Sequence, residues 1–313
     1  MKVLFTADLH IKVGAKKVPR EWQKDRYKLL FKHLEVLQGE VELVVLGGDI
    51  FDKIPNMEEL ELYFDLISKF NTRTIIFDGN HESTRKGRTF LTNLASATNR
   101  INPNVEIING PYRINNMDFI PYTHIKSFSP SDYTGNILFT HVRGRIDPHV
   151  KPEIDLEKLS RWDMVYAGDL HAHSNSQLNI IYPGSPLSTS FHRKAIANGI
   201  IILDSDNNEY EWLGLELPQL IRKTINDHTE AIADEYDHII YEVVGNMAEL
   251  SSVDTENDLI DKKIINKSSE ASLALANMSI PEELTTYMTE VLELDKNSIE
   301  KIMVTYNDYI TEP

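Results

Sequence analysis

Short apolar runs that end in polar residues recur along the first half of the chain. The run from Leu43 to Leu46 has no polar alternation, which predicts a strand buried on both faces. Two glycines follow it and permit a sharp backbone turn, and Asp49 comes next. The carboxyl end of a strand is where open α/β sheets bind their ligands. A single instance has a simpler interpretation, because an Asp at this point more often caps the following helix.

The same pattern occurs four more times, and this repetition favours a shared site. The polar residues that close the other runs are Asp8 and His10 after residues 3–7, Asn80 and His81 after 74–77, His141 after 137–140, and Asp169, His171 and His173 after 164–168. If the runs are neighbouring strands, their ends meet at one rim of the sheets. Carboxylate, amide and imidazole groups together suit Mn²⁺, Fe²⁺ or Zn²⁺ better than Mg²⁺. We therefore expect a metal site at that rim.

The segments between these runs predict an α/β fold that becomes rich in strands (α+β in its later part). Residues 22–37 and 57–70 carry apolar side chains at helical spacing and separate the first three runs, as in βαβ units. Residues 90–97 predict one more helix, and short strand patterns follow between residues 105 and 213. We expect two sheets packed face to face as a ββ sandwich, with helices on the outside.

The last third of the chain predicts a separate, smaller region that begins near Pro218. Residues 238–244 and 260–265 are predicted strands, and residues 281–294 and 297–310 are predicted helices. The apolar stripes of these helices either pack on the rest of the chain or bind a partner, and the sequence leaves both open. The predicted domains are residues 1–215, residues 216–275 and residues 276–313.

Composition excludes several classes of site. The 313 residues include no cysteine, so disulfides, zinc–thiolate sites, iron–sulfur clusters and cysteine nucleophiles are ruled out. No apolar run approaches the ~20 residues that span a bilayer, and no charged-then-apolar leader precedes the first strand. We expect no membrane partner and a reducing, cytoplasmic setting.

The charge of the chain is unevenly distributed. The formal net charge is −16, yet residues 204–313 hold 25 acidic and 7 basic side chains while residues 1–203 hold 23 acidic and 25 basic ones. Bound cations would make the front part more positive, which is compatible with nucleic acid there and a protein partner for the acidic part. The basic stretch from Lys12 to Lys28 is either a solvated face or a phosphate contact.

Four motifs together resemble a known family. Asp8-Leu9-His10, Gly48 to Asp52, Gly79 to Glu82 and the later His141 look like the motif series of calcineurin-like metallophosphoesterases. This resemblance spans about residues 1–203 and implies a two-metal site in a ββ sandwich flanked by helices. Two divalent metal ions are implied, Mn²⁺ first and Mg²⁺ as the alternative.

Two further stretches narrow the resemblance. Gly47 to Pro55 and Tyr182-Pro183-Gly184-Ser185-Pro186 resemble the nuclease subunit of the SbcCD-type double-strand-break repair complex and its phage relatives. This resemblance implies a DNA exonuclease, with endonuclease activity also open, that is coupled to an SbcC-like ABC-ATPase with coiled coils. By position alone, it also implies a small α+β capping domain and a C-terminal helical segment that binds the ATPase. A homodimer stays open.

Roles for single residues follow from these motifs. His81 is placed to protonate the leaving oxygen, and the Asp52 carboxylate is placed to orient it by a hydrogen bond. Three basic residues after the third motif either steer DNA phosphates or form a solvated loop, and two residues of the Tyr-Pro-Gly-Ser-Pro loop are expected to bind substrate. The predicted sets are Asp8, His10, Asp49 and His171 for one metal; Asp49, Asn80, His141 and Asp169 for the other; and Arg85, Lys86, Arg88, Tyr182 and Ser185 for the substrate.

One motif departs from the family pattern. The last metal motif of the family reads Gly-His-x-His, whereas the ungapped match here is Gly168-Asp169-Leu170-His171. A slip of two residues would make His171 and His173 the pair instead, and the strand register favours Asp169.

Two rival functions also remain: a phosphatase or phosphodiesterase for a small phosphoester, and a scaffold subunit with a vestigial metal site.

Overall fold

The computed structural model describes residues 1–16, 18–84, 88–226, 230–232, 236–244, 260–265, 279–290, 292 and 294–311. The polar, acidic residues 251–258, whose sequence predicts an exposed loop or the start of a surface helix, lie outside these residues. Contacts divide the chain into two compact units, one built mainly on residues 1–223 and the other mainly on the C-terminal residues after 261.

The first sheet has six strands in the order β11-β10-β1-β2-β3-β4. Strands β1 to β4 pair with one another in parallel, whereas β10 pairs antiparallel with both β1 and β11. The strands are β1 (Lys2–Thr6), β2 (Leu43–Gly47), β3 (Thr74–Phe77), β4 (Val105–Ile107), β10 (Gly199–Asp204) and β11 (Glu209–Gly214). The first three predicted strands are therefore neighbours in one sheet.

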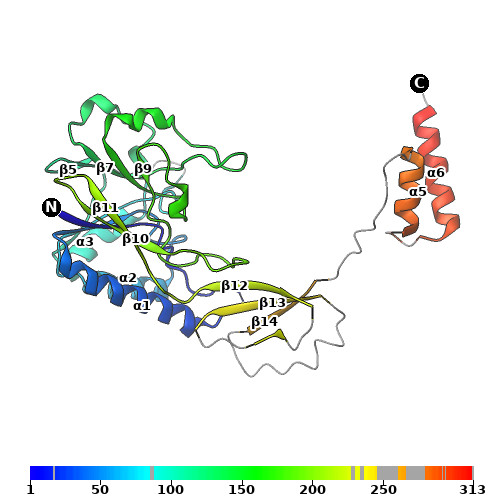
Figure 1. Ribbon diagram of the computed structural model, residues 1–313, viewed down its shortest axis with the longest axis horizontal. Coiled ribbons are helices and arrows are strands. Elements are labelled where there is room, and N and C mark those ends of the chain that lie inside the picture. The colour runs from blue at the N-terminus through cyan, green and yellow to red at the C-terminus, as the bar shows by residue number, and fades with distance from the viewer. Residues whose placement is uncertain are drawn as a thin grey trace. The chain divides into compact units, whose positions relative to one another are not determined.

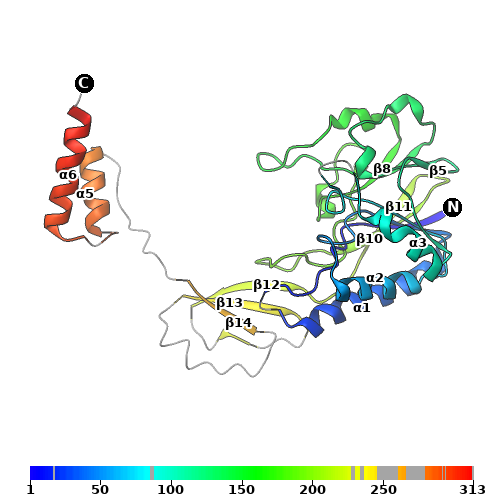
Figure 2. The same cartoon turned by 180° about the vertical axis from the view of Figure 1, so that it is seen from behind.

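Three helices cover one face of this sheet, as Figures 1 and 2 show from opposite sides. They are α1 (Arg20–Leu37), α2 (Met57–Ser68) and α3 (Leu91–Ile101). Leu30 and Leu34 of α1 pack with Leu66 of α2 in one buried cluster that includes residues of β1, β2 and β3. The predicted helices are confirmed with shifted ends: α2 ends two residues earlier than expected, and α3 extends to Ile101.

The second sheet has five strands in the order β5-β6-β7-β8-β9. The strands are β5 (Tyr112–Ile114), β6 (Met117–Ile120), β7 (Ile137–His141), β8 (Met164–Gly168) and β9 (Ile180–Ile181). Strands β6 to β9 pair in parallel. Short 3₁₀ helices complete the connections: η1 (Gln38–Glu40), η2 (Tyr122–His124), η3 (Pro130–Asp132), η4 (Leu156–Arg161) and η5 (His173–Asn175).

The two sheets pack face to face through aromatic side chains. The ring of Phe5 on β1 lies 5.4 Å from that of Phe139 on β7 and 6.1 Å from that of Tyr166 on β8. Strand β2 is buried on both faces as predicted, because Val45 belongs to this layer between the sheets while Leu46 belongs to the layer under the helices. The predicted α/β fold with a two-sheet sandwich and outer helices is confirmed.

The remaining elements form a third sheet and a helix pair. The sheet has the order β12-β13-β14, with strands β12 (Leu220–Ile225), β13 (His238–Val244) and β14 (Ile260–Ile265). The helices are α5 (Ile280–Glu290) and α6 (Lys296–Thr311), which contact one another. The strands predicted at residues 238–244 and 260–265 are thus present, and the first C-terminal helix ends earlier than predicted.

Candidate active site

The ends of β1 and β2 lie together because the loops after them continue to pair. The main-chain N–H of Asp8 donates to Gly48 O at 3.0 Å, and that of His10 donates to Asp49 O at 2.9 Å. Asp8, His10 and Asp49 have φ values of 57°, 45° and 50°, in the left-handed region that residues other than glycine rarely adopt. Such backbone strain persists where surrounding contacts fix it, and it directs these three side chains to one rim.

One group of donor atoms combines the ends of β1, β2 and β8. His10 Nε2 lies 3.1 Å from His171 Nε2, 3.5 Å from Asp49 Oδ2 and 3.9 Å from Asp8 Oδ1. His171 Nε2 in turn lies 3.9 Å from Asp8 Oδ1. The structure therefore brings together all four residues predicted for the first metal.

A second group combines the ends of β2, β3, β7 and β8. His141 Nε2 lies 3.6 Å from Asp49 Oδ2 and 4.0 Å from Asp169 Oδ1. Asn80 Oδ1 lies 2.9 Å from the same imidazole nitrogen. Asp49 belongs to both groups, so the four residues predicted for the second metal share one carboxylate with the first.

Buried charges in these groups shift their pKa values. Burial, followed by repulsion from Asp49, raises the pKa of Asp8 to about 8. Burial and the neighbouring His171 lower the pKa of His10 to about 2. Burial alone would lower the pKa of His141, but the carboxylates Asp49, Asp8 and Asp169 outweigh it and raise the pKa to about 9. Carboxylates buried this close together repel one another, and a cation between them would offset that repulsion.

The donor set fits divalent metal ions. Donor atoms of Asp8, His10 and His171 lie within 4.8 Å of one another, as do those of Asp8, Asp49 and His141. The amide oxygen of Asn80 lies 3.1 Å from Asp49 Oδ2 and 3.2 Å from Asp169 Oδ1. If no cation were bound between these oxygens, the amide nitrogen in the same place would make better hydrogen bonds. Oxygen atoms that face one another in this way are what a bound cation requires. The residues present therefore fit the predicted metals.

Residues 1–197 match the family of calcineurin-like phosphoesterases. The chain belongs to this family. The match confirms the resemblance predicted from the four motifs, and it makes the protein a metal-dependent phosphoesterase.

A full-length relative is known among phage proteins. The chain is 41% identical, over 324 aligned residues, to the probable exonuclease subunit 1 of Escherichia phage T5, and the alignment covers 100% of this chain and 99% of that protein. This match agrees with the narrower resemblance to phage nuclease subunits.

Two solved structures are similar in fold. An archaeal phosphodiesterase has 16% identity and a TM-score of 0.38, with 69% of this chain and 100% of that chain covered. The protein TT1561 of Thermus thermophilus has 11% identity and a TM-score of 0.44, with 68% and 98% covered.

His81 of the phosphoesterase is oriented differently from the sequence prediction. Its Nδ1 makes a 2.7 Å hydrogen bond to the main-chain carbonyl of Asp52, and its Nε2 lies 3.9 Å from Asp49 Oδ2. The Asp52 carboxylate instead pairs with Lys12 Nζ at 2.8 Å. The predicted carboxylate–imidazole bond is therefore wrong, although Asp52 does orient His81. Because Nδ1 is bonded to this carbonyl, the Nε2 atom of His81 faces the two donor groups.

Glu82 anchors the site, and sequence reasoning assigned it no role. Its buried carboxylate accepts three main-chain N–H groups, from Asp49 at 3.0 Å, Phe51 at 2.8 Å and Gly79 at 2.8 Å. Burial, followed by the charge of Asp49, raises the pKa of Glu82 to about 8. The sequence offered one indication of this role, because Glu82 is the last residue of the third motif and directly follows His81.

The Tyr182–Pro186 loop supports the site rather than facing a substrate. The Tyr182 hydroxyl is buried and donates to Val142 O at 3.0 Å. The buried Ser185 hydroxyl lies 2.7 Å from Asp8 O and 2.6 Å from Leu187 O. Since neither side chain is accessible, the prediction that both bind substrate is wrong.

Asp169 and His173 face different surroundings. Asp169 accepts two hydrogen bonds from Arg143 and lies in the second donor group. His173 bonds to Tyr182 O through Nδ1 at 2.7 Å and stacks on Trp212 with ring centroids 5.3 Å apart. The structure therefore favours Asp169 over His173 as a donor, in agreement with the strand register.

The predicted phosphate contacts have mixed outcomes. Arg85 and Lys86 lie outside the described residues, and Arg88 is exposed. Arg26 from the basic stretch is buried and donates to the carbonyls of Pro218 and Ser188, both at 2.9 Å. Its phosphate-contact interpretation is wrong, because a buried guanidinium that binds main-chain carbonyls supports the fold.

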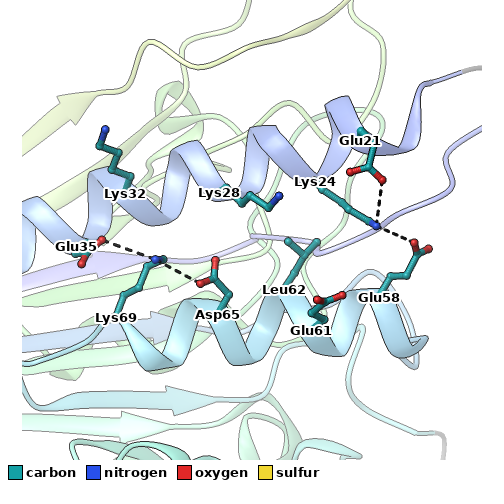
Figure 3. Close-up of a pocket in the computed structure, with 10 residues that line it drawn as sticks. All are labelled: Glu21, Lys24, Lys28, Lys32, Glu35, Glu58, Glu61, Leu62, Asp65 and Lys69. Atoms are coloured by element: carbon teal, nitrogen blue, oxygen red, sulfur yellow. Dashed lines mark hydrogen bonds and ion pairs between the residues drawn. The ribbon is translucent and has the colours of Figure 1, made fainter.

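A pocket between α1 and α2 is lined almost entirely by charged side chains of both signs (Figure 3). Lys24 lies 3.3 Å from Glu21 and 2.9 Å from Glu58, and Lys69 lies 3.3 Å from Asp65. None of the predicted site residues lines this pocket, and these two lysines already have acidic partners.

Among the described residues, no helix combines the length and apolarity needed to cross a membrane.

Proposed function

We propose that this phosphoesterase is a Mn²⁺-dependent DNA exonuclease and the catalytic subunit of an ATPase-coupled repair or recombination complex in the cytoplasm. The observation that carries the proposal is the pair of donor groups that share Asp49, with His81 beside them. The full-length relative, a probable exonuclease subunit of phage T5, supports DNA as the substrate. The imidazole-rich donor set supports Mn²⁺ over Mg²⁺.

The two donor groups would hold one divalent ion each. Asp8, His10, Asp49 and His171 would hold the first; Asp49, Asn80, His141 and Asp169 would hold the second. Bound there, two metals would withdraw charge from the phosphoryl oxygens and lower the pKa of the attacking water.

The proposed reaction is an in-line hydrolysis of a phosphodiester. A new bond forms between the water oxygen and phosphorus, and the bond from phosphorus to the leaving oxygen breaks. His81 holds its Nδ1 proton against Asp52 O, so its Nε2 is the nitrogen that transfers a proton to the leaving oxygen. The products are one fragment that ends in a phosphomonoester and one fragment that ends in a hydroxyl group.

A nuclease assay with matched variants tests the proposal. End-labelled linear double-stranded DNA is incubated with Mn²⁺ and wild type, Asp49→Ala, His81→Ala or His149→Ala, where His149 is an exposed histidine of another loop. We expect degradation by wild type and His149→Ala, loss of activity and bound metal in Asp49→Ala, and loss of activity with metal retained in His81→Ala.

The opposite outcome is equally specific. If wild type binds metal but leaves the DNA intact, the assay is repeated with an SbcC-like ABC-ATPase present. Continued inactivity on DNA, together with hydrolysis of a small phosphodiester, would overturn the nuclease proposal in favour of the small-substrate phosphodiesterase.

We further propose that residues 216–275 form a capping domain and that residues 276–313 bind the ATPase. Helices α5 and α6 expose the apolar side chains of Tyr287, Ile302 and Val304, which supports a partner surface. Substitution of Tyr287 and Val304 by Glu should abolish co-purification with the ATPase and leave Mn²⁺ binding unchanged. Retained co-purification would contradict this role.

A further inference from the structure

A forked ion pair holds the carboxylate of Asp169. Arg143 Nε lies 3.1 Å from Asp169 Oδ2, and Arg143 Nη2 lies 3.1 Å from Oδ1. The Asp169 side chain is 5% exposed, whereas that of Arg143 is 41% exposed. Two parallel N–H···O bonds fix the rotation of a carboxylate, which a single contact would not do.

Strand pairing determines this contact. In the parallel pair β7 and β8, His141 lies opposite Gly168. Arg143 and Asp169 therefore leave adjacent strands at nearly the same level. The Arg143 main chain is itself held, because its N–H donates to Glu153 Oε1 at 3.0 Å and the other oxygen of Glu153 accepts from the Tyr122 hydroxyl at 2.9 Å.

The fork leaves one oxygen of Asp169 directed at the second donor group. Asp169 Oδ1 lies 3.2 Å from the amide oxygen of Asn80 and 4.0 Å from His141 Nε2. Without this restraint, the Asp169 carboxylate could rotate and move Oδ1 away from Asn80 and His141. A carboxylate fixed by an outer partner meets a cation already in position.

We propose that Arg143 is a positioning residue for the second metal and that it acts through Asp169. The proposal rests on the proposed function only for the presence of two metals. Arg143 would set the orientation of the Asp169 carboxylate, and this role needs the guanidinium fork rather than a positive charge alone. A neutral imidazole at position 169 would not need such a partner.

Calorimetric titration of the metal-free full chain with Mn²⁺ tests the proposal without DNA. We expect Arg143→Gln to weaken the second Mn²⁺ site by about 10-fold and to leave the first unchanged. Arg143→Lys should be equally deficient, because a lysine keeps the charge without the fork. Arg145→Gln removes the same charge from an exposed position two residues further along the loop and should match wild type.

A double-mutant cycle then tests whether Arg143 acts through Asp169. In the Asp169→His background, Arg143→Gln should cause no further loss of Mn²⁺ affinity. Equal losses in both backgrounds, wild-type affinity in Arg143→Lys, or unchanged or tighter binding in Arg143→Gln would each overturn the proposal. If Arg143 and Asp169 are coupled in Mn²⁺ binding but the protein leaves DNA uncut, only the nuclease function is overturned. If the wild type binds fewer than two Mn²⁺ ions, the positioning role of Arg143 is overturned.

Discussion

The Nε2 atoms of His10 and His171 lie 3.1 Å apart, although 161 positions separate the two residues in the chain. Burial lowers the pKa of both imidazoles, and in His10 the proximity of His171 lowers it further. Both rings are therefore neutral near pH 7, and neutral imidazole is the form that binds metal.

This pair predicts the result of removing either ring. His10→Ala and His171→Ala should each reduce the Mn²⁺ content from two ions to one. The loss of affinity should exceed the ~10–100-fold that follows from changes around a metal ligand, since a donor itself is removed. Metal analysis after dialysis measures the content, and two retained ions in either variant would contradict the assignment.

Asp169 and His173 can be separated by substitution. Asp169→Ala should lose the second metal, because Asp169 lies in the second donor group. His173→Ala should keep both metals, because its ring stacks on Trp212 and bonds to Tyr182 O. Mn²⁺ titration of the two variants decides between them, and the reverse result would move the ligand pair to His171 and His173.

Removal of Glu82 should unfold the loop that presents Asp49. Glu82→Ala leaves three buried main-chain N–H groups without an acceptor, which predicts a loss of about 3 kcal/mol or more in the free energy of unfolding. Glu106→Ala, at an exposed position on β4, should stay within ~0.5 kcal/mol of wild type. Urea unfolding of the metal-free proteins measures both, and equal stabilities would refute the anchoring role.

The stability of the metal-free protein should fall as pH rises from 6.5 to 8. Asp8 and Glu82 have pKa values of about 8 in the folded state, above those of exposed carboxyl groups, so the folded state binds more protons in this range. His141 contributes with the same sign, because its pKa is raised to about 9 and its stabilisation is lost as pH rises. His10 has the opposite sign, because its pKa is lowered from the ordinary value near 6.5 to about 2, so near pH 6.5 only the unfolded imidazole binds protons. This contribution fades above pH 7 and is smaller than the combined effect of Asp8, Glu82 and His141.

Thermal unfolding in a chelating buffer at several pH values tests this dependence. Mn²⁺ should reverse the slope, because deprotonated donors bind metal more tightly. A melting temperature that rises with pH in the metal-free protein would contradict the predicted sign.

The sequence by itself determined where the donor groups come from. Apolar runs specify buried strands, and parallel neighbours place their carboxyl ends at one rim, so Asp8, Asp49, Asn80 and His141 could be expected to meet. This information is local: it depends on the residue types at strand ends and on a pattern that any fold of this class must satisfy.

Tertiary structure alone decided how the side chains are used. Asp52 contributes a carbonyl rather than a carboxylate, Tyr182 and Ser185 face inward, and Arg143 pairs with Asp169. Each of these contacts joins residues far apart in the chain, and such pairings are not encoded in the periodicity of the sequence. The direction of a side chain in a loop is set by the packing of neighbouring elements, so it appears only once the sheets are assembled.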